Sequence, residues 1–133
     1  MIIAIDDIEA TQVIAQYVVE HYPKVKVIAR AKSRTDAFTL AKLGVETIRE
    51  TLGSALHAGE HALIALGDSL DFAKRQVALF QAHDAQFFKE QLPHIDDMKK
   101  IRAMVNQGRD DVRTLLSAEL EAQKNKPKGQ NTW

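Results

Sequence analysis

The sequence contains no cysteine, which excludes disulfide bonds and thiol chemistry. It carries no net charge either, because 18 lysines and arginines balance 18 aspartates and glutamates. We therefore expect no nucleic-acid partner, since such partners select a basic surface. No apolar run approaches the ~20 residues of a membrane span, and the start lacks the basic region and apolar core of a signal peptide. These absences are typical of a soluble, cytoplasmic protein.

Glycine is also scarce, with six residues in 133. None of them falls into a G-x-G-x-x-G arrangement, the turn whose backbone N–H groups bind a pyrophosphate at a helix N-terminus. The pyrophosphate-binding turn is therefore missing from this chain. At 45% hydrophobic residues, the chain can still form one domain with a substantial core.

The first thirty residues predict a strand, a helix and a second strand. The apolar run from Ile2 to Ile5 is typical of a strand buried on both faces of a parallel sheet. Asp6 is the expected N-cap of the helix, with Glu9 at capping-box spacing, and Pro23 ends that helix. Residues 25–29 read as the second strand, and a right-handed crossover makes the two strands parallel.

A second helix and a third strand follow. Ser33 is predicted to cap the helix together with Asp36, and Gly44 to end it in the left-handed conformation. Residues 45–48 are the predicted third strand. We therefore predict an α/β fold, in which a half Rossmann-like, three-stranded parallel sheet (β-α-β-α-β) is followed by long C-terminal helices.

Residues 53–66 predict a helix rich in small side chains, which allow a second helix to approach closely. A three-stranded sheet hides little apolar surface, so we favour a homodimer interface over an interior helix. The residues expected at this interface are Leu56, Gly59, Ala62, Leu63 and Leu66.

Two longer helices complete the predicted organisation. A heptad seam runs through Leu70, Ala73, Val77, Phe80, Asp84 and Phe87. A last helix from about residue 96 to 122 has an inner face of Ile101, Val105, Gly108, Val112, Leu115 and Leu120. The two helices join at residues 92–94 and are predicted to form a helical hairpin or part of a shared bundle. The predicted parts are a half-domain (1–52), a dimerisation helix with the hairpin (53–123) and a disordered tail (124–133).

One motif suggests metal chemistry. His57, Glu60 and His61 match H-x-x-E-H, in which two histidines hold zinc and the glutamate acts as a base. A small metal-dependent hydrolase is thus one alternative. We favour a polar stripe instead, because Gly59 weakens the helix and no third ligand is evident. The chain is accordingly predicted not to be an enzyme.

A second group of polar residues follows the predicted strands. Asp6 and Asp7 come after the first strand, and Arg30 stands at the matching end of the second. In open α/β sheets, ligands bind outside these carboxyl ends. An arginine placed there can bind a carboxylate or phosphate through two parallel hydrogen bonds. Asp6, Asp7 and Arg30 are therefore the candidate site residues.

Several segments together resemble one family. They are AIDD (4–7), HYPKVKVIARA (21–31), LGVETIRETLGSALHAG (43–59) and the ALIALG that follows. In order and spacing they are similar to the nucleotide-binding regulatory domain (RCK or KTN type) of Kef-type potassium/proton antiporters. The resemblance covers roughly residues 2–92.

The resemblance implies a cytosolic domain that dimerises and regulates a membrane antiporter domain. It implies NAD(H) or AMP in the crevice bordered by Asp6 and Asp7, and glutathione or a related acidic ligand near Arg30. The glycine loop and the acid that holds the ribose are absent, so we expect a truncated domain with weak or no nucleotide binding. The remaining alternative is a helical oligomerisation module without a ligand.

Overall fold

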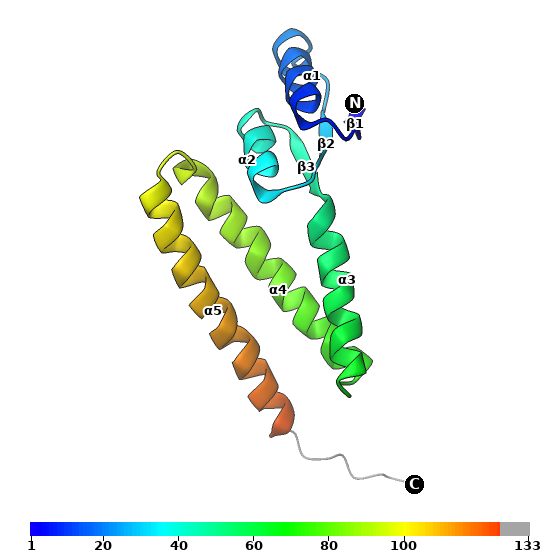
Figure 1. The fold of residues 1–133 in the computed structure, drawn as a ribbon, viewed down its shortest axis with the longest axis vertical. Helices are drawn as coiled ribbons and strands as arrows, with labels where there is room; N and C mark the ends of the chain where they lie inside the picture. Colours follow the sequence, from blue (N-terminus) through cyan, green and yellow to red (C-terminus); the bar gives the residue numbers. More distant parts are fainter. Residues whose placement is uncertain (126–133) are drawn as a thin grey trace. The chain divides into compact units, whose positions relative to one another are not determined.

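The computed structural model describes residues 1–125 (Figure 1). Its elements are β1 (Ile2–Ile3), α1 (Ile8–His21), β2 (Ile28–Ala31), α2 (Arg34–Lys42), β3 (Glu46–Arg49), α3 (Glu50–Ala65), α4 (Leu70–Gln91), the 3₁₀ turn η1 (Leu92–His94) and α5 (Met98–Lys124). The chain divides into two compact units, Met1–Ala58 and Gly59–Trp133. The predicted α/β fold, a three-stranded parallel sheet followed by long helices, is confirmed.

The sheet of the first unit has the order β1-β2-β3, with all strands parallel. Successive right-handed crossovers place α1 and α2 on the same side of such a sheet, as Figure 1 shows. Ala29 and Ala31 are fully buried, whereas Ile2 and Ile48 are 74% and 55% exposed. The prediction that the first strand is buried on both faces is therefore wrong, because helices of this unit cover one face only.

The strand boundaries also differ from those predicted. β1 ends at Ile3 rather than Ile5, and Ile5 is exposed. β2 begins only at Ile28, while Val25 lies in an exposed loop. β3 lies one residue later than predicted, at Glu46–Arg49. Apolar residues beside a strand look like strand residues in the sequence, whereas the strand itself ends where pairing with its neighbour ends.

The helix caps follow from local side-chain chemistry, with one correction. Ser33 Oγ accepts a hydrogen bond from Asp36 N at 3.1 Å, and Asp36 Oδ2 accepts one from Ser33 N at 3.0 Å, which confirms the predicted capping box. Gly44 takes a positive φ of 78°, as expected for the stop after α2. The N-cap of α1, however, is Asp7 rather than Asp6, since Asp7 Oδ1 accepts from Ala10 N at 3.0 Å.

In the second unit, α4 and α5 pack as an antiparallel hairpin joined at Leu92–His94, which confirms the predicted hairpin (Figure 1). The inner face of α5 departs from the prediction toward its C-terminal end. Leu115 and Leu120 are exposed, whereas Leu116 and Glu119 are half-buried. A helix of 3.6 residues per turn drifts against a fixed repeat, so the buried stripe moves over 27 residues.

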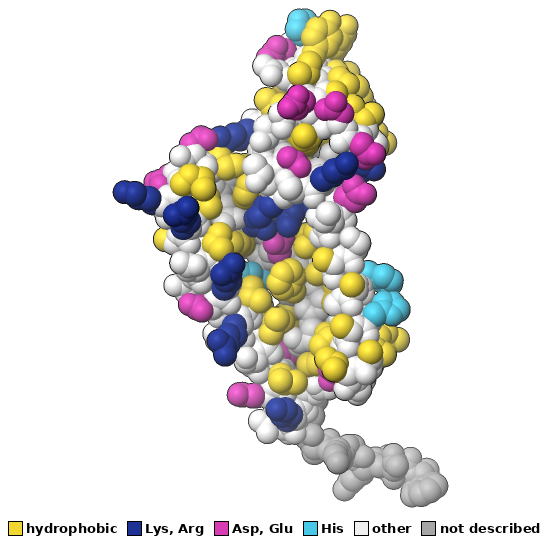
Figure 2. Space-filling model, viewed as in Figure 1, with side chains coloured by type: hydrophobic (Ala, Val, Ile, Leu, Met, Phe, Trp, Pro, Cys, Tyr) yellow, Lys and Arg dark blue, Asp and Glu magenta, His cyan; other side chains and the backbone are white. Residues whose placement is uncertain are grey.

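Helix α3 begins at Glu50, three residues before the predicted start, because it follows β3 directly. Within the described residues 1–125, none of its side chains is buried. Figure 2 shows hydrophobic side chains at the surface over α1 and α3, and Leu66, just after α3, is 82% exposed. Among the described residues 1–125, no helix is long and apolar enough to span a bilayer.

The remaining organisational predictions are not tested. The boundary predicted between residues 52 and 53 stays a prediction. Of the tail predicted for residues 124–133, Lys124 is the last residue of α5, and residues 126–133 lie outside the described part of the chain.

Candidate functional site

The candidate site is an ion-pair cluster around Arg30, near the carboxyl end of β2. Arg30 Nη2 donates a hydrogen bond to Asp6 Oδ1, and Arg30 Nε lies 3.3 Å from Glu50 Oε2. Asp6 follows β1 and Glu50 follows β3. Because the strands are parallel, their carboxyl ends meet at one edge, and this brings three segments far apart in the sequence together.

A second cation joins this cluster. Lys32 Nζ lies 3.4 Å from Asp6 Oδ1, so Asp6 faces both Lys32 and Arg30. The charge of Lys32, then its hydrogen bond, and then the charge of Arg30 hold the pKa of the Asp6 carboxyl below its usual value. As a result, the Asp6 carboxyl stays ionised to a lower pH than the carboxyl of a free aspartate. Its side chain is 80% exposed, so this is a surface interaction that salt weakens.

The guanidinium of Arg30 is the most enclosed group of the cluster. Its side chain is 29% exposed, against 49% for Glu50 and 53% for Lys32. The Nε atom is buried and makes no hydrogen bond within the described residues, although Glu50 lies at ion-pair distance. Arg30 is therefore held in place by carboxylates while part of its donor capacity is unused.

The structure brings together two of the three predicted site residues. Asp6 and Arg30 are in contact, whereas the Asp7 carboxylate is engaged as the cap of α1. Lys32 and Glu50 were missed. Two signals could have revealed them: Lys32 lies two positions after Arg30, and Glu50 directly follows the third strand. Ionisable residues at the carboxyl ends of parallel strands converge there whatever their sequence separation.

The H-x-x-E-H segment lies within α3. Among residues 1–125, no group of three or more His, Cys, Asp or Glu side chains is arranged to hold a metal ion. His57, Glu60 and His61 therefore gain no further ligand in the described part of the chain. The alternative of a metal-dependent hydrolase has no geometric support there.

Comparison with known proteins identifies relatives. Residues 54–131 match the family described as the potassium efflux system KefB C-terminal domain. A solved structure, the Kef C-terminal domain of Shewanella denitrificans in AMP-bound form, is 38% identical in sequence. The match covers 69% of this chain and 59% of that chain, with a TM-score of 0.66.

The family match and the match to the solved relative overlap, but they cover different fractions of this chain. The family match spans more than half of the chain. The structural match rests on substantial sequence identity as well as on the fold, although this chain spans 59% of the relative's length. The segments that resembled a Kef-type domain in the sequence therefore reflect a true relationship, and the chain belongs to the family of Kef potassium-efflux C-terminal domains.

Proposed function

We propose that this chain is a cytosolic regulatory domain of a Kef-type potassium/proton antiporter and that Arg30 binds the acidic ligand that it senses. The observation that carries the proposal is the position of Arg30 at the carboxyl edge of the parallel sheet, held between Asp6 and Glu50. This edge is where open α/β sheets bind ligands. The solved relative was obtained with AMP, another acidic molecule.

The electrostatics of the cluster suit a ligand that replaces one carboxylate. The side chains of Asp6 and Glu50 are 80% and 49% exposed, so moving either one away from Arg30 costs little. A carboxylate or phosphate could then accept two parallel hydrogen bonds from the guanidinium. Lys32 would add a second positive charge at the same place. Glutathione, with two carboxylates, has the required chemistry.

Dimerisation through α3 is the second part of the proposal. An apolar helix with no buried residue in the described chain is well suited to packing against a second copy. In a dimer, binding at Arg30 would be coupled to the arrangement of α3 because Glu50 is the first residue of that helix. A change in the arrangement of α3 would then be transmitted to the membrane antiporter domain and would gate potassium efflux.

The test is a titration of the isotope-labelled chain with glutathione, followed by NMR, which detects binding as weak as millimolar. Arg30→Ala and Arg30→Lys should both reduce the affinity, by about tenfold or more, because lysine cannot reproduce the planar pair of donors. Arg102→Lys, at an exposed position of α5, is the matched control and should bind as the wild type does. Normal binding by Arg30→Lys would contradict the proposal.

A second candidate function is a pure assembly module. The exposed apolar surface of α3 favours it, since packing alone would account for this surface. The same titration separates the two candidates. Dimerisation without binding of any acidic ligand supports the assembly module, whereas saturable, Arg30-dependent binding supports the regulatory domain.

A further inference from the structure

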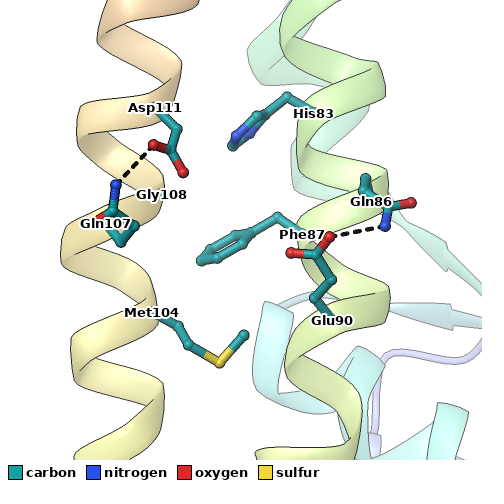
Figure 3. Close-up of a pocket in the computed structure, with 8 residues that line it drawn as sticks. All are labelled: His83, Gln86, Phe87, Glu90, Met104, Gln107, Gly108 and Asp111. Atoms are coloured by element: carbon teal, nitrogen blue, oxygen red, sulfur yellow. Dashed lines mark hydrogen bonds between the residues drawn. The ribbon is translucent and has the colours of Figure 1, made fainter.

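A pocket of about 300 Å³ lies between α4 and α5 in the second unit (Figure 3). Phe87 from α4 and Met104 and Gly108 from α5 are the apolar part of its lining. Its volume lies at the small end of the usual range for ligand sites, ~300–1,000 Å³. The pocket is therefore suited to a small molecule or to one part of a larger one.

Most of the polar lining is one amide–carboxylate pair on each helix. On α4, Gln86 Nε2 donates a hydrogen bond to Glu90 Oε1 at 2.8 Å. On α5, Gln107 Nε2 donates to Asp111 Oδ1 at 2.9 Å. In each pair the residues are four positions apart and so share a helix face. Both carboxylates are thus oriented by a neighbour on their own helix (Figure 3).

These two pairs give the pocket a surplus of hydrogen-bond acceptors. Each amide uses an N–H group on its own carboxylate, while its oxygen and the remaining carboxylate lone pairs can still accept. His83, stacked against Phe87 with ring centroids 6.0 Å apart, contributes the remaining polar ring. The lining contains two carboxylates and neither lysine nor arginine. A cationic molecule rich in hydrogen-bond donors would complement this lining.

We propose that this pocket binds a small organic cation with N–H donors, that is, a primary alkylammonium or guanidinium compound. Glu90 and Asp111 would accept its hydrogen bonds from opposite helices and neutralise its charge. The face of Phe87 would contact the cation or its alkyl chain, and a cation–π contact favours a charged over a neutral ligand. The proposal does not depend on ligand binding at Arg30.

The experiment titrates the full chain, labelled with nitrogen-15, with putrescine, a small diamine. Saturable shifts are expected at the amides of Phe87 and Gly108. 1,4-Butanediol, which has hydroxyl groups in place of both ammonium groups, should cause no saturable shift. The double variant Glu90→Gln with Asp111→Asn keeps the side-chain shapes and should lose about tenfold or more in affinity, because the charged acceptors are gone. Phe87→Leu should lose about two- to fivefold.

Asp110→Asn is the matched control, since Asp110 is exposed and adjacent to Asp111 but does not line the pocket. It should bind putrescine as the wild type does. Thermal unfolding of each variant verifies folding, and if the double variant unfolds, each single substitution is expected to weaken binding by itself. Equal binding of putrescine and butanediol, or equal losses in Asp110→Asn and Asp111→Asn, would overturn the proposal.

Discussion

The ring of Phe87 on α4 lies directly against Gly108 on α5 (Figure 3). A β-carbon added to Gly108 would lie 2.8 Å from Cζ of Phe87, well inside van der Waals contact. Glycine in a helix interior costs about 1 kcal/mol relative to alanine. The contact explains why a glycine stands here despite that cost: without a side chain, position 108 leaves room for the Phe87 ring between the two helices of the hairpin.

This contact leads to a prediction for a double-mutant cycle. Gly108→Ala should stabilise a Phe87→Ala background by about 0.5–1 kcal/mol, the usual gain in helix propensity. In the wild-type background the ring must move, so the same substitution should be neutral or destabilising. Chemical denaturation of the four proteins measures the coupling, which we expect to be about 1 kcal/mol. Equal effects in both backgrounds would show that the ring does not constrain position 108.

A second prediction concerns the pH dependence of the Arg30 cluster. Because Lys32 and Arg30 lower the pKa of Asp6 in the folded chain, Asp6 contributes stability above its unfolded pKa of about 3.9. That contribution disappears as the pH falls through the lowered folded value. Lys32→Gln should raise the Asp6 pKa, as measured by NMR titration of its carboxyl carbon. Lys24→Gln, at an exposed loop position, should leave it unchanged.

The Ser33 capping box gives a third prediction, for stability. Ser33→Ala removes the acceptor for Asp36 N and should lower the free energy of unfolding by about 1 kcal/mol. Ser117→Ala, at an exposed position inside α5, is the control and should be neutral or slightly stabilising. Thermal or urea unfolding of both variants measures the difference in their free energy of unfolding. Equal stability of the two would mean that the cap contributes nothing.

A fourth prediction tests the proposed dimer. Apart from the neighbouring backbone of its own helix, no described atom lies within 4 Å of a β-carbon built at Gly59, so a side chain can begin there without a clash inside one chain. A clash must then come from a second copy. Sedimentation should give twice the monomer mass for the wild type at tens of micromolar, within the ~µM–mM range of weak association. Gly59→Leu should shift it toward monomer, and a monomeric wild type at this concentration would refute the interface.

The last prediction concerns nucleotides. The chain should bind NADH and AMP with dissociation constants weaker than ~1 µM. Its six glycines build no phosphate-binding loop, so backbone N–H groups for a pyrophosphate are lacking. Titration calorimetry of the chain with NADH and with AMP measures the two dissociation constants. Micromolar or tighter binding would mean that Arg30 and Lys32 build a phosphate site without that loop.

Local chemistry accounts for the parts of the fold that could be predicted. The capping box at Ser33, the left-handed Gly44 and the hairpin turn at Leu92–His94 each depend on a few neighbouring residues. The alternation of strands and helices follows likewise from hydrophobic periodicity. The sequence therefore determined the order of the elements and the family, because helices, strands, turns and family motifs are encoded within short segments. The parallel direction of the strands follows from that order, since a helix connects each strand to the next.

Contacts between distant segments decided the rest. Capping-box spacing to Glu9 favours Asp6 as the cap, whereas the structure uses Asp7 as the cap and pairs Asp6 with Arg30, 24 positions away. Glu50 entered the site only because parallel strands end at one edge of the sheet. Gly108 acquired its role from Phe87 on another helix. Such pairings depend on how elements pack, and periodicity within one segment contains no information about its neighbour's side chains.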